Sequence, residues 1–233
     1  MAEVRRIYLA TSNPGKVREF QEAAQSLGLT MAPLPALTSL PLPVEDGLTF
    51  EENARKKAEY YSRHAAGELV LPSQIAQERR DPGALVLAED SGLSVDALSG
   101  APGVYSARYA AVLRSGMATH ENSGDQENNL ALVHELERLG DGKFAAKYVS
   151  VIALARDGRT LATFTGEAHG EIVTVPRGTG GFGYDPLFYF PALGKTFAEL
   201  PLEEKRKHSH RGQAFRKVLE WWGQNHESLR VET

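Results

Sequence analysis

The sequence predicts an α/β or α+β fold. Apolar residues recur at helical spacing towards both ends of the chain, and a run of strand-like segments lies between them. The length of 233 residues suits one large domain or two small lobes with a sizeable core. The chain shows neither an internal repeat nor a coiled-coil heptad pattern, which leaves a mixed globular fold as the prediction.

The N-terminal half of the chain alternates strand and helix patterns. A capping box from Thr49 to Glu52 marks one helix start, because the two side chains can each accept a hydrogen bond from the other residue's backbone N–H. In chain order we expect a strand at 4–10, a turn at 11–15 and a helix that ends before Gly28. A second helix follows Thr49, and strands are expected at 84–88 and 92–98. A third helix should run from Ser123 or Asp125 to Gly140, with Leu130, Val133, Leu136 and Leu139 on one face.

The C-terminal half is richer in strands. Asp157-Gly158 separates two strand-like segments and predicts a tight hairpin turn. The last helix is expected to begin near Ser209 with its apolar face inward. The expected strands are 147–155, 160–166 and 171–175. Earlier in the chain, the segment 71–83 is expected to be a surface loop or a short helix, because prolines and a glycine flank a polar stretch.

Composition and charge narrow the class of protein. The hydrophobic fraction of 42% and charged fraction of 24% are typical of soluble globular proteins. The absence of cysteine excludes disulfides and thiolate metal sites and suits a reducing compartment. The apolar run 7–10 is too short for a signal peptide or a membrane span, so we expect a cytoplasmic protein with no membrane partner.

The distribution of charge points to a small anionic ligand. The net charge of −4 argues against broad nucleic-acid binding. Residues 203–217 nevertheless contain six Lys or Arg against two Glu. Such a local basic patch suits a small polyanion, although a solvated helix face would have the same composition.

The segment Thr11-Ser12-Asn13-Pro14-Gly15-Lys16 joins the first strand to the first helix. Exposed N–H groups and the positive end of the helix dipole favour phosphate there, and Lys16 adds a full charge. The segment differs from the Walker A pattern, which needs a longer loop ending in Gly-Lys-Ser/Thr. Alone, it is equally compatible with an ordinary helix start.

Two acidic segments could share one metal ion. Glu45-Asp46 precedes the helix at Thr49, and Glu89-Asp90-Ser91-Gly92 follows the strand 84–88, where α/β proteins usually place ligands. Mg2+ prefers carboxylate, water and phosphate oxygens, and a carboxylate beside it could deprotonate the attacking water. The alternative is that Asp46 and Asp90 only cap turns before glycines.

Two segments near the C-terminus could recognise a base. In the glycine-rich stretch 178–186, Phe182 or Tyr184 could cover the face of a flat ligand, and Asp185 could accept hydrogen bonds from it. Lys205 and the run Ser209-His210-Arg211-Gly212 offer donors for purine carbonyl oxygens or phosphate. The alternatives are a hairpin loop with aromatic residues in the core and a helix start capped by Ser209. Together the four groups of residues supply the parts that phosphoryl hydrolysis needs.

Six segments of the chain resemble the inosine triphosphate pyrophosphatase family and follow its order along nearly the whole sequence. They are 10–16, 45–50 with Asn53-Ala54, 89–93, 100–109, 181–186 and 209–212. The resemblance implies one α/β domain over 1–233, in which a long central mixed sheet and two lobes flank a nucleotide cleft. It also implies a homodimer that hydrolyses ITP, dITP and XTP to the monophosphate and pyrophosphate with Mg2+, which removes these nucleotides from the pool.

The resemblance also implies roles for individual residues. Glu45 and Asp90 would bind Mg2+, and Asp90 would accept the proton of the attacking water. The triphosphate would be held by Thr11, Ser12, Asn13, Pro14, Gly15 and Lys16, with Lys57 assisting. The other substrate contacts would be Ser91, Phe182, Gly183, Tyr184, Asp185, Lys205, His210 and Arg211.

The chain departs from the family pattern at two places. Many members have Asp-Asp-Ser-Gly where this chain has Glu89-Asp90-Ser91-Gly92, so the resemblance assigns no role to Glu89. The stretch 67–83 is longer than in compact bacterial members, and we expect it to be a surface insertion that leaves the site unchanged.

Two other functions fit the sequence less well. A Maf-like house-cleaning pyrophosphatase would carry serine and arginine after the first strand, where this chain has Asn13-Pro14-Gly15-Lys16. A nucleotide-binding regulator without catalysis would not need a water-activating carboxylate. Selectivity for 6-keto purines over ATP is expected if Arg211 or protonated His210 donates to the base, whereas the rejection of GTP has no explanation in the sequence.

Overall fold

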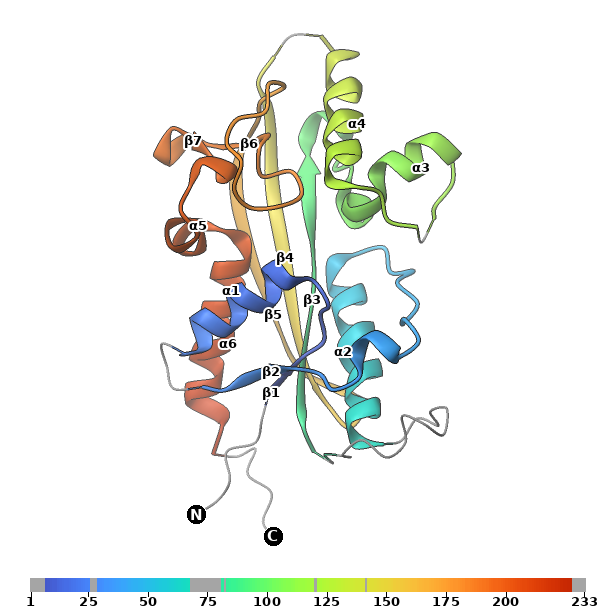
Figure 1. Cartoon of the computed structure of the whole chain (residues 1–233), viewed down its shortest axis with the longest axis vertical. Coiled ribbons are helices and arrows are strands. Elements are labelled where there is room, and N and C mark those ends of the chain that lie inside the picture. Colours follow the sequence, from blue (N-terminus) through green and yellow to red (C-terminus); the bar gives the residue numbers. More distant parts are fainter. Residues whose placement is uncertain are drawn as a thin grey trace.

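A long mixed sheet forms the centre of the protein (Figure 1). The computed structural model describes residues 7–25, 29–67, 81, 83–119, 121–140 and 142–227, and within them the sheet has seven strands in the order β2-β1-β3-β4-β5-β6-β7. The pairs of β1 with β2 and β3 are parallel, and the remaining pairs are antiparallel. The predicted α/β class with a long mixed sheet is therefore confirmed.

The elements follow the chain in a βα pattern that later changes to a hairpin. The strands are β1 (Ile7–Leu9), β2 (Met31–Pro33), β3 (Leu85–Val95), β4 (Phe144–Arg156), β5 (Arg159–Ile172), β6 (Phe188–Phe190) and β7 (Lys195–Thr196). The helices are α1 (Pro14–Gln25), α2 (Phe50–Ala66), α3 (Tyr109–Ser115), α4 (Asp125–Glu137), α5 (Leu202–His208) and α6 (His210–Asn225), and η3 (Gly103–Arg108) is a 3-10 helix. No helix within the described ranges is long and apolar enough to cross a membrane.

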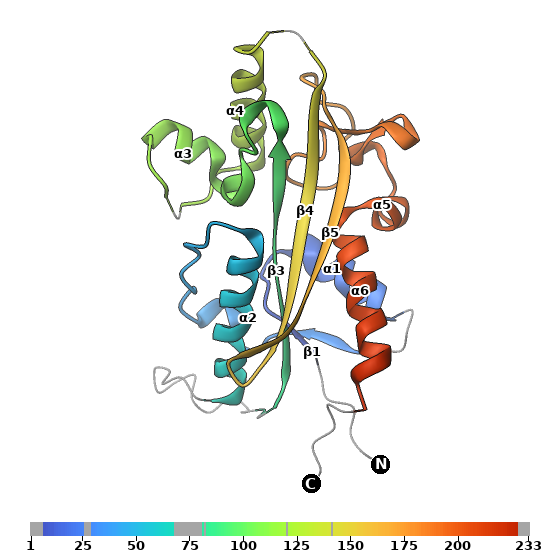
Figure 2. The same ribbon diagram turned by 180° about the vertical axis from the view of Figure 1, so that it is seen from behind.

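The two faces of the sheet are covered by different helices. Val86 and Ala88 of β3 pack in a core with α2, whereas Leu85 and Leu87 pack in a core with α1 and α6. Figures 1 and 2 show α2 and α6 on opposite sides of the long strands. Because side chains alternate along a strand, Asp90 continues the α2 face of β3, and its two neighbours continue the α1/α6 face.

A third core fills the other end of the sheet. It joins Leu132 and Leu136 of α4 to Phe188 of β6 and to Phe197. Figure 1 shows α3 and α4 on the β3 side of the sheet at this end, while β6 and β7 continue the sheet beyond β5. The middle of β3 therefore lies between one packed region built on α1, α2 and α6 and a second built on α4 and β6.

Local signals in the sequence located several element boundaries. Thr49 caps α2 by accepting a hydrogen bond from the Glu52 N–H at 3.1 Å, and Ser209 caps α6. Asp157 and Gly158 both have positive φ, 47° and 74°, as the predicted tight turn between β4 and β5 requires. These three predictions are confirmed. The predictions for 71–83, and for an insertion at 67–83, fall largely on 68–80 and 82, which lie outside the described residues.

The two strands expected at 84–88 and 92–98 are one continuous strand, β3. Its antiparallel partner β4 pairs with every residue from Val86 to Val95, so the acidic segment lies in the middle of a strand and not after its end. Gly92 permits this arrangement because a Cβ there would lie 2.3 Å from Ser106 Oγ, so only a glycine lets η3 pack so closely.

Two further expectations about elements were wrong, the second only in part. The segment 171–175 is not a separate strand, because β5 runs through to Ile172 and the next strand is β6. The inner face of α4 carries Leu132 and, as expected, Leu136 with the partly buried Val133, whereas Leu130 and Leu139 are exposed. The apolar spacing alone allowed either face of α4, and the packing against β6 and Phe197 decided between them.

Candidate active site

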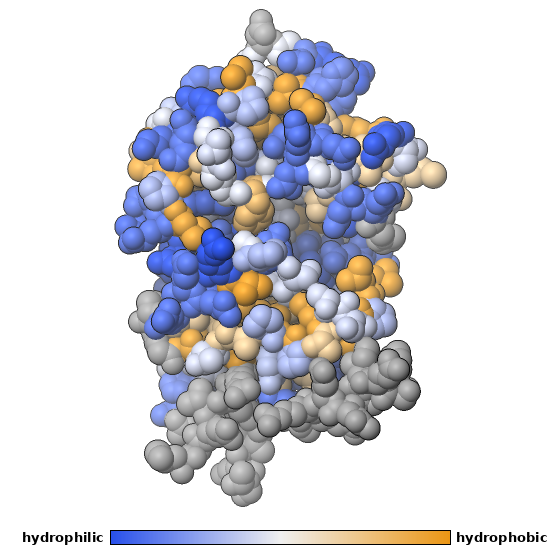
Figure 3. Space-filling view, in the orientation of Figure 1, coloured by the Kyte–Doolittle hydropathy of each residue, from blue (hydrophilic) through white to orange (hydrophobic). Residues whose placement is uncertain are grey.

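A cavity of about 570 Å³ opens where the middle of β3 meets the starts of α1 and α6. Figure 3 shows hydrophilic side chains gathered at mid-height on the same face of the molecule. Of the predicted site residues, the cavity is lined by Thr11, Ser12, Asn13, Lys16, Glu45, Lys57, Ser91, Phe182, Gly183, Tyr184, Asp185, Lys205, His210 and Arg211. Pro14, Gly15 and Asp90 lie beside it without lining it, and Lys57 connects Asp90 to the wall.

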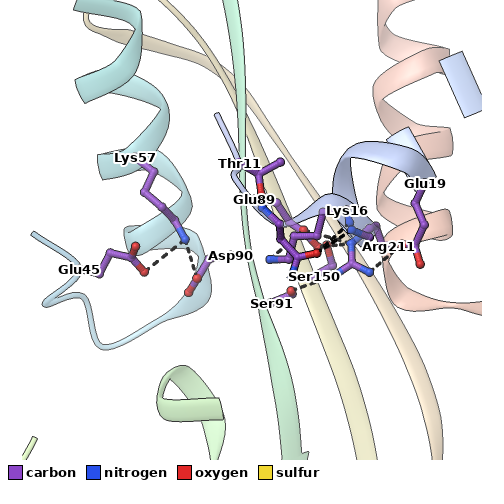
Figure 4. Close-up of polar contacts among 12 residues, drawn as sticks. Thr11, Lys16, Glu19, Glu45, Lys57, Glu89, Asp90, Ser91, Ser150 and Arg211 are labelled. Atoms are coloured by element: carbon purple, nitrogen blue, oxygen red, sulfur yellow. Dashed lines mark hydrogen bonds and ion pairs between the residues drawn. The ribbon is translucent and has the colours of Figure 1, made fainter. Parts of the chain in front are cut away.

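On the α2 face of β3, two carboxylates share one ammonium group (Figure 4). Lys57 Nζ lies 2.7 Å from Asp90 Oδ1 and 3.3 Å from Glu45 Oε2. One turn earlier on α2, Asn53 donates to Asp90 Oδ2 at 3.3 Å and accepts from the Gly47 N–H at 2.8 Å. The spacing of four puts Asn53 and Lys57 on the same side of the helix. Helix α2 thus brings the acidic segment at 45–47 to the middle of β3.

The oxygen atoms of this group suit a divalent cation. Burial alone would lower the pKa of Lys57, but Asp90 and Glu45 outweigh it and raise the pKa above its usual value. The ammonium therefore stays charged and lies where carboxylate oxygens from two segments meet. Mg2+ takes one or two carboxylates together with waters and phosphate oxygens, which matches this donor set. No group of three or more His, Cys, Asp or Glu in the described part of the chain could hold a metal by itself.

On the α1/α6 face of β3, Glu89 binds two cations (Figure 4). Arg211 Nε lies 2.9 Å from Glu89 Oε1 and 3.1 Å from Oε2, and Lys16 Nζ lies 3.1 Å from Oε2. Ser150 Oγ donates to Oε1 at 2.7 Å. Burial alone would raise the pKa of Glu89, but Arg211 and Lys16 outweigh it and hold the pKa well below its usual value. The buried carboxylate is therefore ionised at neutral pH.

Further ion pairs extend from Arg211 into the protein. Its Nη1 donates to Glu19 Oε2 at 2.7 Å and its Nη2 to Ser91 Oγ at 3.3 Å. Lys205 Nζ lies 2.6 Å from Asp185 Oδ2 and 3.8 Å from Glu19 Oε1. We call this set the buried ion network; its three carboxylates and three cations are Glu19, Glu89, Asp185, Lys16, Lys205 and Arg211. Such a network is tolerated in the interior because each charge has a partner.

The start of α1 is capped by Asn13. Its Oδ1 accepts hydrogen bonds from the backbone N–H groups of Gly15 and Lys16 at 2.9 and 3.1 Å. The expectation that these N–H groups are free for phosphate is therefore wrong. Thr11, Ser12 and Lys16 still line the cavity, and the positive end of the helix dipole lies beside them. Burial lowers the pKa of Lys16, although Glu89 opposes the shift.

The two aromatic residues of the glycine-rich segment have different environments. Tyr184 is buried, and its hydroxyl donates to the Ser106 carbonyl at 2.8 Å. The ring of Phe182 is partly exposed and lies 4.9 Å from Lys205 Nζ and 5.2 Å from the Arg211 guanidinium carbon. A Cβ at Gly15 would lie 3.2 Å from two carbons of this ring, so a larger residue there would press against Phe182. Phe182 is therefore the aromatic side chain available to cover a base.

His210 is buried at the start of α6 and stacks on Tyr148, with ring centroids 4.5 Å apart and planes 10° from parallel. Burial, and then the charge of Arg211, hold the pKa of His210 well below its usual value. The protonated donor considered from the sequence is thus disfavoured. The neutral ring still carries one N–H, and its Nδ1 has no hydrogen-bond partner among the residues that the structure describes.

Sequence reasoning missed several residues that hold the site together. Asp125 accepts a hydrogen bond from the Gly183 N–H at 2.6 Å and so fixes the glycine-rich segment to α4. Glu19 follows Lys16 by three residues on α1, a spacing that could have indicated it. Ser150 and Tyr148 reach the site only through the pairing of β4 with β3, which no local signal reveals.

The chain is similar to known proteins in both sequence and structure. The profile of the Ham1 family matches residues 7–221. A dITP/XTP pyrophosphatase of Acidobacterium capsulatum is 47% identical over 213 residues, which cover 91% of this chain and 96% of the relative. One of Thermus thermophilus is 46% identical and covers 92% of this chain and 90% of the relative. The structure of a HAM1 protein from Coxiella burnetii superposes with a TM-score of 0.75 at 35% identity, covering 94% of this chain and 99% of that one.

Proposed function

The chain belongs to the Ham1 family, and from this premise we propose that it hydrolyses non-canonical purine nucleoside triphosphates such as ITP, dITP and XTP. The products are the nucleoside monophosphate and pyrophosphate. One observation carries the proposal: a single cavity is lined by Lys16 at the start of α1, by Glu45 and Lys57, and by Phe182, and Lys57 also binds Asp90 beside the cavity.

The two ends of the substrate would lie on different parts of the cavity. Phosphate oxygens would accept hydrogen bonds from the hydroxyl groups of Thr11 and Ser12 and would neutralise the Lys16 ammonium, while Pro14 and Gly15 shape the turn. Ser91 and Gly183 would contact the substrate between its two ends. The base would lie near Phe182 and the start of α6, where Asp185, Lys205, His210 and Arg211 surround it. Tyr184 supports this end from the core.

Glu45 and Asp90 would hold Mg2+, which would offset the negative charge of the phosphates. Asp90 would accept a proton from the attacking water as the bond between the α- and β-phosphates breaks and pyrophosphate leaves. Its carboxylate is oriented for this role by Asn53 and Lys57, which each donate a hydrogen bond to it. Lys57 would then contact the phosphates.

Selection of the base would depend on a neutral His210. A 6-keto purine presents an acceptor at C6 where adenine presents a donor, so an N–H of His210 would pair with the former and clash with the latter. Arg211 contributes less directly, since Glu89, Glu19 and Ser91 accept hydrogen bonds from its guanidinium. An unpaired polar group in a dry site costs enough to discriminate between the two bases.

Three further properties belong to the same proposal. The chain forms a single domain over 1–233, it assembles as a homodimer and it acts in the cytoplasm. No binding of nucleic acid or membrane is expected. Size-exclusion chromatography with light scattering would test the dimer, and a mass of one chain, 25.4 kDa, would contradict it.

The decisive experiment measures pyrophosphate release from ITP, dITP, XTP, GTP and ATP, each with Mg2+ and with EDTA. We expect release from the first three that depends on the metal, with little from GTP or ATP. Orthophosphate as the first product, or no turnover, would refute the reaction. Equal turnover of ATP and ITP would refute the selectivity while leaving the reaction intact.

A further inference from the structure

Glu89 takes no part in the chemistry proposed above, although it precedes Asp90 directly. Its side chain is only 1% exposed and lies on the α1/α6 face of β3, whereas Asp90 lies on the α2 face. Both carboxylate oxygens of Glu89 are occupied by donors from Arg211, Lys16 and Ser150. A metal held by Glu45 and Asp90 therefore finds no free oxygen of Glu89 beside it.

The contacts of Glu89 join the two ends of the cavity. Lys16 belongs to the start of α1, where the phosphates would bind, and Arg211 belongs to the start of α6, where the base would bind. We infer that Glu89 is a positioning residue that holds Lys16 and Arg211 in fixed relation, so that the phosphate end and the base end of the site are aligned for one substrate. This inference rests on the proposed function and adds a role for a residue to which the reaction gives none.

The two cations depend on Glu89 to different degrees. Arg211 also pairs with Glu19, whereas Glu89 is the ion partner of Lys16 among the residues that the structure describes. Without the charge of Glu89, Lys16 would face the guanidinium of Arg211 with no carboxylate between them. Loss of Glu89 should therefore weaken the phosphate end of the site more than the base end.

The length of the side chain also matters. The backbone of residue 89 is fixed by its pairing with Ile152 of β4. Aspartate at this position would shorten the reach of the carboxylate by about 1.5 Å, the length of one carbon–carbon bond. Because the contacts to Lys16 and Ser150 already measure 3.1 and 2.7 Å, they would be stretched or lost without a shift of the strand.

The experiment compares Glu89→Gln, Glu89→Asp and Ser150→Ala with wild type. Three quantities are measured: kcat and KM for ITP, the inhibition constant of inorganic tripolyphosphate, and the affinity for Mn2+ without nucleotide, by electron paramagnetic resonance. Tripolyphosphate has no base and so reports on the phosphate end alone. Asp90→Asn is the reference for a lost metal ligand, and Glu167→Gln, which removes a half-exposed carboxylate paired with Lys147, is the matched control.

For Glu89→Gln we expect KM for ITP and the inhibition constant of tripolyphosphate to rise about tenfold, because a charge-assisted contact that orients Lys16 is lost. The Mn2+ affinity should stay within about twofold of wild type, while Asp90→Asn weakens it. In Glu89→Asp both constants should rise less than in Glu89→Gln, because aspartate keeps the negative charge. Glu167→Gln should leave all three measurements unchanged.

Two outcomes would overturn the inference. A fall in Mn2+ affinity in Glu89→Gln to the level of Asp90→Asn would make Glu89 a metal ligand. Unchanged KM and inhibition constants would remove its positioning role. If Glu89→Gln does not fold, Ser150→Ala, which removes one hydrogen bond to Glu89, must raise the tripolyphosphate constant, and failure to do so also counts against it. Absence of ITP hydrolysis by wild type would refute the proposed function instead, and the tripolyphosphate and Mn2+ measurements would still test Glu89.

Discussion

The two faces of β3 arrange charge in different ways within two consecutive residues. On the α2 face, Glu45 and Asp90 share Lys57, which leaves one negative charge in excess at the edge of the cavity. On the α1/α6 face, Glu89 belongs to the buried ion network, in which three carboxylates balance three cations. The first arrangement suits the binding of a cation. The second fixes lysine and arginine side chains in positions that suit the binding of an anion.

The comparison separates residues that carry a reaction from residues that support it. Asp90 has its carboxylate beside the cavity and binds Lys57, and in the proposed reaction it would exchange this partner for a metal. Glu89 is fully buried, and each of its contacts would cost energy to break. Under the proposed function, the same kind of side chain serves turnover on one face and geometry on the other.

The largest effect is expected on the α2 face, from Asp90→Asn. Amide in place of carboxylate removes the proton acceptor, a contribution of about 10²–10⁴-fold. We expect kcat for ITP to fall by this factor while nucleotide still binds, as measured by isothermal titration calorimetry. A variant that turned over ITP at the wild-type rate would eliminate the distinction between the two faces.

The next effect concerns stability on the α1/α6 face. Arg211→Met leaves Glu89 and Glu19 buried without their guanidinium partner, and the free energy of unfolding should fall by about 3–5 kcal/mol. Urea unfolding followed by circular dichroism measures this. The matched control Arg138→Ala, which breaks the exposed pair with Glu135, should cost less than about 1 kcal/mol. Equal losses in both variants would mean that burial of the network has no special cost.

A smaller effect tests whether Lys57 occupies the place of a cation. Lys57→Met removes the ammonium that binds both Glu45 and Asp90. We expect the affinity for Mn2+ without nucleotide to increase roughly tenfold, which corresponds to about 1.4 kcal/mol. The affinity for ITP should decrease in the same variant because a phosphate contact is lost. A decrease in Mn2+ affinity would instead make Lys57 an organiser of the metal ligands.

The smallest effect follows from His210 on the α1/α6 face. Its pKa in the folded protein lies well below 6.5, so the unfolded chain binds a proton first as the pH falls. The stability that neutral His210 allows is thus present above pH 6.5 and is lost below it, by at most about 1.4 kcal/mol per pH unit. Urea midpoints at pH 7.5 and 5.5 should differ less in His210→Asn than in wild type. An equal difference would show that folding does not lower the pKa of His210.

Much of the local structure could be predicted from the sequence. The starts of α2 and α6 follow from the capping residues Thr49 and Ser209, and the β4–β5 hairpin follows from Asp157-Gly158. These signals act between residues a few positions apart, so they hold before any tertiary contact forms. The inner face of α4 was predicted only in part, at Val133 and Leu136, because its leucines satisfy two helical stripes and only packing selects one.

The sequence predicted which residues form the candidate site better than it predicted how they are arranged. The short segments identified which residues gather at the cavity, and most of them line it. The capping of α1 by Asn13 was not anticipated, although an asparagine before a helix is a common cap. Tyr148 and Ser150 were not identified because they join the site from β4 through strand pairing alone.

The sequence by itself determined the α/β class, the main turns and caps, and the acidic, basic and aromatic segments from which the site is built. Only the tertiary structure decided that Glu89 and Asp90 serve opposite faces of one strand, that Phe182 and not Tyr184 is free to cover a base, and that His210 is neutral. The physical reason is that side chains alternate between the two faces of β3, and these faces differ only once β4 has fixed the register of the strand and α2, α1 and α6 have covered it.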